Sequence, residues 1–191
     1  MKILCLYNNE CAPELFDLLK QQGHDTVLYS DRLSKEWCED NNFDFALSYT
    51  YRYIIPQDII EVFGGNIVNL HNSFLPYNRG AAPNIWSIVE GTPRGVTLHY
   101  IDKNLDKGRI ITQRLVPLKK GATLKSSYAE LDKNAKEMFM EAFGYYDFWK
   151  EMSKKVEGNG SYHSVADTKM ITETIDSYDI SVEDFLKRIK K

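Results

Sequence analysis

The chain has 191 residues, of which 43% are hydrophobic, as in a globular protein with a sizeable core. Its 24 basic against 27 acidic side chains leave a net charge of −3, which excludes the basic excess typical of general nucleic-acid binders. No apolar run approaches the ~18 residues of a membrane span. We therefore expect a cytoplasmic protein with neither a nucleic-acid nor a membrane partner. The three cysteines have no metal-ligand spacing and are expected to be reduced.

The first third of the chain alternates short apolar segments with amphipathic ones. Strands are expected at residues 2–7, 25–30, 43–49 and 66–70, and helices at 12–23, 33–42 and 56–63. Gly23 stands where a helix-ending glycine belongs, Ser34 is the expected N-cap of the second helix, and Pro56 opens the third. This alternation predicts an α/β fold with an open, mostly parallel, twisted sheet and helices on both faces.

The remainder of the chain extends the same pattern. A helix ending at Gly91 is followed by two strands at 94–102 and 108–118, and a long helix is expected from Thr123 to Met152. A polar tail, 157–169, precedes a final amphipathic segment at 181–191. Because no change of composition marks a boundary, we expect a single domain, 1–191, with a core of about 1–150 and a C-terminal extension at 151–191.

The segment IVNLHNSFLPYNRGAAPN places polar side chains where a buried strand ends. Residues two apart in a strand share a face, so Asn69 and His71 point the same way at the sheet edge where open α/β sheets bind ligands. An amide N–H can stabilise an oxyanion, an imidazole can take a proton, and Asp106 in NLDKGRI can orient that imidazole. By itself, an Asn-x-His at a strand end is more often a hydrogen-bonded structural pair than a site, and Asp106 before Gly108 is also typical of a turn.

Two longer motifs resemble a known family. NLHNSFLPYNRGAAPN and GVTLHYIDKNLDKGRII, in this order and at this separation, are similar to the Rossmann-like formyltransferase fold. That family includes glycinamide ribonucleotide formyltransferase, the catalytic domain of methionyl-tRNA formyltransferase and the sugar N-formyltransferases. The resemblance covers about residues 1–150 and implies an enzyme that transfers the formyl group of N10-formyltetrahydrofolate to a primary amine.

The resemblance also implies roles for individual residues. Asn69 would hold the oxyanion, His71 would carry the amine proton, and Asp106 would orient and charge-balance His71, with no metal. The folate cosubstrate would be bound around YRYIIP and the later strand end, by Arg52, Tyr53, Ile54, Ile55, Ile101, Asp102 and Asp106.

Three acceptors compete within the family. The methionyl-tRNA enzyme carries a further C-terminal domain, whereas this chain ends at Lys191. The purine-pathway enzyme has a Gly-rich first loop that encloses a phosphate, but YNNECAPEL contains no glycine. The favoured acceptor is therefore a UDP-, dTDP- or GDP-linked amino sugar, a 4-amino-4,6-dideoxy hexose of an O-antigen or pseudaminic-acid-type pathway. The alternatives are the purine acceptor and a non-catalytic folate-binding relative, and a homodimer is the default expectation.

The acceptor site can be outlined from side-chain chemistry. A diphosphate needs a cation, and Arg79 can make a bidentate contact. Neutral donors and aromatic faces would complete the site. The candidates are Asn8, Asn9, Tyr77, Asn78, Arg79, Trp86, Tyr162 and His163.

Overall fold

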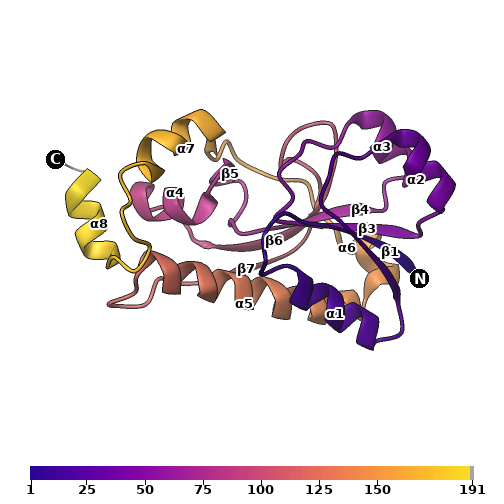
Figure 1. The fold of residues 1–191 in the computed structure, drawn as a ribbon, viewed down its shortest axis with the longest axis horizontal. Coiled ribbons are helices and arrows are strands. Elements are labelled where there is room, and N and C mark those ends of the chain that lie inside the picture. The colour runs from indigo at the N-terminus through magenta and orange to yellow at the C-terminus, as the bar shows by residue number, and fades with distance from the viewer. Residues whose placement is uncertain (190–191) are drawn as a thin grey trace. The chain divides into compact units, whose positions relative to one another are not determined.

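The structure, a computed structural model, describes residues 1–189 (Figure 1). Contacts divide the chain into two compact units, and each draws on three stretches of sequence. The first comprises Met1–His71, Leu98–Ile111 and Phe148–Lys155, and the second comprises Asn72–Thr97, Thr112–Asp147 and Val156–Lys191. Lys190 and Lys191, the end of the expected final amphipathic segment, lie outside the described residues.

A parallel sheet forms the centre of the first unit. Its strands are β1 (Lys2–Leu6), β2 (Asp25–Tyr29), β3 (Phe45–Tyr49) and β4 (Ile67–His71). They are parallel, with β1 between β2 and β3 and with β4 beyond β3. β1 and β3 are apolar along almost their whole length because a parallel strand is covered on both faces.

Helices cover this sheet on both sides. In Figure 1, α2 (Lys35–Asn41) and α3 (Gln57–Val62) lie on one side of the strands, and α1 (Pro13–Gln21) and α6 (Trp149–Met152) on the other. Beneath α2 and α3, a buried cluster includes Leu4, Leu6 and Phe63. The fold class expected from the sequence is confirmed.

Two further strands complete the six-stranded sheet, whose order is β2-β1-β3-β4-β6-β7. β6 (Gly95–Tyr100) and β7 (Ile110–Leu115) form a hairpin, and the N–H of Tyr100 donates to the carbonyl of Arg109 at 2.9 Å. Leu98–Tyr100 and Ile110–Ile111 belong to the first unit, and the other ends of both strands to the second. The loop that joins them carries Asp106.

The second unit is mainly helical. It contains α4 (Pro83–Glu90), α5 (Leu124–Phe143), α7 (Val165–Thr172) and α8 (Val182–Ile189). Of the 3-10 helix Tyr146–Phe148, the first two residues belong to this unit and Phe148 belongs to the first unit. Two short strands, β5 (Arg79–Gly80) and β8 (Tyr162–His163), pair in parallel. Its core packs Ile85 and Ile88 of α4 against Leu124, Val182 and Phe185.

The local signals were accurate at helix ends and weaker in the long helix. Gly23 and Gly91 have positive φ after α1 and α4, and the Ser34 side chain caps α2 as expected. The expected helix from 123 to 152 is wrong as one element, since α5 ends before Gly144 and a 3-10 turn and α6 follow. Pro56 is the N-cap of α3 rather than part of its first turn.

Two global expectations can be compared with the described residues. None of the cysteines forms a disulfide within residues 1–189, and Cys5 and Cys38 are buried as small apolar side chains. No helix in residues 1–189 combines the length and the apolar character that crossing a membrane requires.

Candidate active site

β4 ends in the polar pair that the sequence singled out. Asn69 and His71 are the third and fifth residues of this strand, and they therefore share a face. Asn69 is paired in register with Ser48 of the neighbouring β3. His71 is 8% exposed, whereas Asn69 is only partly buried.

The loop after β6 brings Asp106 to the same place. Asp106 has a φ of 52°, a left-handed conformation that aspartate tolerates better than most residues. Gly108 allows the loop to pass close to β6, because a Cβ there would lie 1.7 Å from the carbonyl oxygen of Tyr100. The LDKG spacing thus reflects backbone geometry that holds a carboxylate, 8% exposed, in position.

Asp106 lies between two imidazoles of the first unit. Its Oδ2 is 3.7 Å from Nε2 of His71, and its Oδ1 is 3.7 Å from Nε2 of His99. These are ion-pair distances rather than hydrogen-bond distances. The carboxylate can therefore stabilise a positive charge that appears on His71 when the imidazole takes up a proton.

His99 was not among the residues predicted from the sequence. It is 1% exposed, its Nδ1 is 2.9 Å from the carbonyl oxygen of Tyr100, and its Nε2 is 3.3 Å from Nδ2 of Asn69. Burial lowers the pKa of His99 below its usual value, and nearby Asp106 only partly opposes this. The available signal was an imidazole within the largely apolar strand segment VTLHY.

The predicted folate-binding residues lie in two stretches of the first unit. The side chain of Ile54 is 75% exposed, whereas Ile55 is buried in the core cluster on which Ile101 also packs. The guanidinium groups of Arg32 and Arg52 lie 4.7 Å and 5.0 Å from the ring centre of Tyr53.

Hydrogen bonds hold these two stretches in shape. Asp102 accepts a hydrogen bond of 2.7 Å from the N–H of Asn104. The N–H of Arg52 donates to Oδ1 of Asn8 at 2.9 Å, so the loop after β3 is tied to the loop after β1.

The first two predicted acceptor contacts, Asn8 and Asn9, also belong to the first unit. The Asn8 side chain donates to the carbonyl of Ser30 at 2.7 Å. The N–H groups of Asn8 and Asn9 lie 3.4 Å and 3.2 Å from Oγ1 of Thr50, which has a φ of 64°. These asparagines thus connect the loops that follow β1, β2 and β3.

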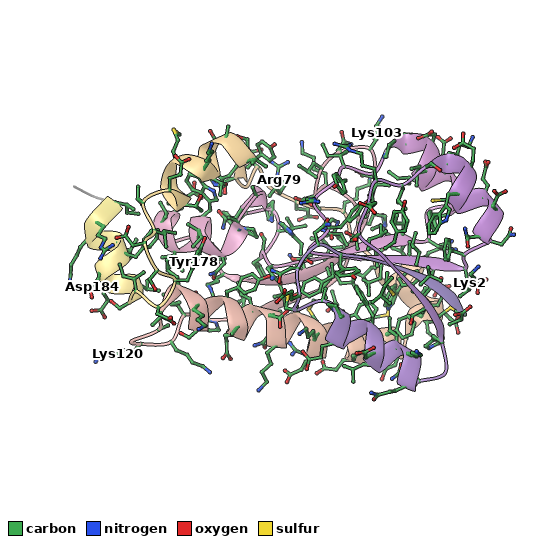
Figure 2. All side chains as sticks on the ribbon, in the orientation of Figure 1. Lys2, Arg79, Lys103, Lys120, Tyr178 and Asp184 are labelled. Atoms are coloured by element: carbon green, nitrogen blue, oxygen red, sulfur yellow. The ribbon has the colours of Figure 1, made fainter. Side chains whose placement is uncertain are left out.

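The other predicted acceptor contacts gather around β5 and β8 in the second unit. Arg79, labelled in Figure 2, is paired in register with Tyr162 of β8. Tyr162 is 52% exposed. Asn78 is buried, where its Nδ2 donates to Thr92 at 2.7 Å and its N–H donates to Oγ of Ser161 at 2.9 Å. Asn78 therefore fixes the loop before Arg79. The N–H of Tyr77, beside it, donates to Phe74.

Two predicted aromatic contacts in this unit stack on each other. The rings of Trp86 and His163 are parallel to within 5°, with their centres 3.7 Å apart, so one face of the indole is covered. Oε1 of Glu90 lies 3.1 Å from Nε2 of His163, which is an ion-pair distance. The side chain of Arg79 has a buried Nε for which the described residues provide no hydrogen-bond partner.

The site residues are thus found in two groups. Asn69, His71, Asp106 and the predicted folate contacts belong to the first unit, and Tyr77, Asn78, Arg79, Trp86, Tyr162 and His163 to the second. Their individual roles in binding and catalysis stay predictions.

An amide beside an imidazole–carboxylate pair at the end of a parallel strand is the arrangement that the sequence motifs implied. Residues 9–143 match the family described as "Formyl transferase". The chain belongs to the formyl transferase family. It is therefore related to a family of enzymes, as the motifs indicated.

Known relatives support the family at both the fold and the sequence level. A crystal structure of the formyltransferase PseJ from Anoxybacillus kamchatkensis superposes with a TM-score of 0.87 and 38% identity, covering 97% of each chain. That structure contains UDP-4,6-dideoxy-4-formamido-L-AltNAc and tetrahydrofolate.

Two curated relatives match over shorter stretches. The dTDP-4-amino-4,6-dideoxyglucose formyltransferase of Mycobacterium bovis is 39% identical over 101 residues, which are 53% of this chain and 42% of the relative. A methionyl-tRNA formyltransferase of Thermodesulfovibrio yellowstonii is 40% identical over 78 residues, which are 40% of this chain and 25% of the relative. The match thus spans less than half the length of either curated relative.

Proposed function

We propose that the protein transfers the formyl group of N10-formyltetrahydrofolate to the primary amine of a nucleotide-linked 4-amino-4,6-dideoxy sugar. The observation that supports this most strongly is the similarity to PseJ along 97% of both chains, since that structure holds a formamido nucleotide sugar and tetrahydrofolate. We further propose that residues 1–191 act as one formyltransferase domain.

The first unit supplies groups for each step of this transfer. The acceptor amine attacks the formyl carbon, and the oxyanion that forms is stabilised by an N–H of Asn69. His71 takes the proton that the amine loses, and Asp106, 3.7 Å away, balances the charge of the imidazolium. The bond from the formyl carbon to N10 then breaks, and the same proton passes to N10, so that the products are the formamide and tetrahydrofolate.

The loop after β3 suits a flat heterocycle such as a pterin. Ile54 exposes an apolar side chain, while Ile55 anchors the loop in the core. We propose that backbone groups of residues 52–55, with Ile101 and Asp102, hold the pterin.

For the acceptor, we propose that β5 and β8 present a diphosphate contact. Arg79 is the proposed cation, because its Nε lacks a partner among the described residues. Tyr162, opposite it, offers an exposed ring for a sugar or base. UDP and dTDP are the nucleotides in the names of PseJ's ligand and the mycobacterial enzyme. Both are therefore the first to test here.

The test is a mass-spectrometric transfer assay with N10-formyltetrahydrofolate and UDP- or dTDP-linked 4-amino-4,6-dideoxy sugars. We expect a formyl mass gain on the sugar and an equimolar amount of tetrahydrofolate. His71→Asn and Asp106→Asn should each lower kcat by roughly 10²- to 10⁴-fold, because they remove the base or its counter-charge. Full turnover by a folded His71→Asn variant would contradict the mechanism.

A further inference from the structure

We propose that His99 is a positioning residue for Asn69: as a neutral imidazole, it accepts a hydrogen bond from the Asn69 amide and thereby orients that amide for oxyanion binding. The inference concerns the proposed transfer site and rests on the proposed function for its kinetic consequences. It assigns a role to a buried histidine that neither the Asn69, His71 and Asp106 set nor the folate contacts include.

The direction of each hydrogen bond follows from what the partner atoms can do. The carbonyl of Tyr100 only accepts, so at 2.9 Å the Nδ1 of His99 must carry the proton. In the neutral ring, Nε2 is then an acceptor. At 3.3 Å from it, Nδ2 of Asn69 must be the donor. One carbonyl oxygen thus determines the orientation of an amide two hydrogen bonds away.

The alternative orientation requires a charged His99. Only an imidazolium, protonated on both nitrogens, could donate to Tyr100 and also to a reversed Asn69 amide whose oxygen faced the ring. His99 is 1% exposed, and this burial disfavours the charged form more than Asp106 favours it. Asp106, at 3.7 Å, is also too far to accept a hydrogen bond from Nε2.

The consequence concerns the second N–H of the Asn69 amide. An amide NH₂ group has two donors, and the bond to His99 uses one of them. The other remains for an oxyanion, in a direction fixed by the first. If the amide reversed, an acceptor oxygen would take its place and would repel the developing negative charge. A neutral His99 therefore prevents the orientation that would be inhibitory.

Two substitutions of similar size separate this role from simple packing. His99→Gln can place its side-chain oxygen near the former Nε2 and still accept from Asn69. His99→Asn can reproduce the donor to Tyr100 but not that acceptor. We expect His99→Asn to lower kcat by roughly 10- to 100-fold with little change in either KM, and His99→Gln to recover most of this loss. Equal losses in the two variants would overturn the proposal.

A double-mutant cycle identifies the residue through which His99 acts. Asn69→Ala alone removes the oxyanion donor and should lower kcat by roughly 10²- to 10³-fold. In that background, His99→Asn should change kcat by no more than about twofold, because the amide it would orient is absent. A further loss as large as in the wild type would show that His99 acts independently of Asn69, and would overturn the proposal.

NMR of the wild-type protein provides a test that requires neither activity nor a variant. Long-range ¹⁵N–¹H spectra of histidine-labelled protein report which ring nitrogen carries the proton. We expect His99 to be neutral and protonated on Nδ1 at pH 7, although Asp106, Asp102 and His71 all face it. A cationic ring at pH 7, or a proton on Nε2, would overturn the proposal. This outcome is independent of whether formyl transfer itself is found.

Discussion

Burial of the His99 imidazole predicts how the free energy of unfolding changes in acid. The pKa of His99 is lower in the folded protein than in the unfolded chain, mainly because of burial. Below pH 6.5, His99 therefore binds a proton more readily in the unfolded chain than in the native state. The contribution of His99 to the free energy of unfolding is fully present above pH 6.5. It is lost as the pH falls toward the folded pKa, at a limit of about 1.4 kcal/mol per pH unit for one proton.

Urea denaturation from pH 7.5 to pH 5 tests this residue directly. The free energy of unfolding should fall more steeply with acidification in the wild type than in His99→Gln. His24, whose pKa is also lowered, is present in both proteins and cancels in the comparison. Parallel pH profiles would mean that His99 is protonated in the native state.

Substitution of Arg79 tests the proposed diphosphate contact. If its guanidinium contacts the diphosphate, Arg79→Ala should raise the acceptor KM by roughly 10- to 100-fold, in keeping with the ~1.5–3 kcal/mol of a hydrogen bond to a charged group. The dissociation constant of the folate should be unchanged. Arg79→Lys, which keeps the charge but not the bidentate geometry, should be intermediate. Equal effects on acceptor and folate would refute the diphosphate role.

Among individual residues, the sequence revealed those whose chemistry follows from local spacing. Asn69 and His71 could be found because they lie two positions apart on one strand, and Asp106 because of its glycine-bearing motif. His99 could not be found in this way, because it lies 30 positions further along the chain than Asn69. Only the pairing of β6 with β4 brings the two side chains together. The covering of Trp86 by His163 is a long-range contact of the same kind.

Among the elements, the pairing of β5 with β8 depends on Gly80. This glycine has a φ of 88°, and a Cβ on it would lie 2.3 Å from the carbonyl oxygen of His163. Gly121 provides a matched control, since its φ is 75° but a Cβ there would meet nothing within 4 Å. Both alanine variants bear the strain of a positive φ, about 1 kcal/mol, and only Gly80→Ala adds a clash.

Thermal and urea denaturation of the two variants measure that difference. We expect Gly80→Ala to lose roughly 2 kcal/mol more than Gly121→Ala, because a backbone carbonyl cannot move aside without breaking the strand pair. The acceptor KM should rise as well, because Arg79 and Tyr162 lie on these strands. Equal destabilisation by the two substitutions would show that the β5–β8 pair tolerates displacement.

Elements with strong periodic signals were predictable, and elements formed by tertiary contacts were not. The strands β1 and β3 are largely apolar runs of five residues, whose burial on both faces is visible in composition. A two-residue strand such as β5 has no periodicity to detect. The helix expected from 123 to 152 is too long because the apolar spacing continues past Gly144, whereas the helical backbone of α5 ends at Phe143.

At the scale of the whole molecule, the proposed chemistry belongs to one unit. The amide, both imidazoles and the carboxylate are all contributed by β4, β6 and the loop after β6. The second unit carries the residues proposed for acceptor choice. Family members with different acceptors can therefore share the catalytic set, and catalytic variants alone will not identify the acceptor.

Acceptor choice is the central claim, and one competition assay tests it most directly. We would combine the protein and N10-formyltetrahydrofolate with equal amounts of four acceptors: UDP- and dTDP-linked 4-amino-4,6-dideoxy sugars, glycinamide ribonucleotide and methionyl-tRNA. Mass spectrometry then follows formyl incorporation into each acceptor. We predict a kcat/KM for one nucleotide sugar more than about 100-fold above that for the other two acceptor classes. Preferred formylation of glycinamide ribonucleotide or methionyl-tRNA, or no transfer to any amine by folded protein, would contradict it.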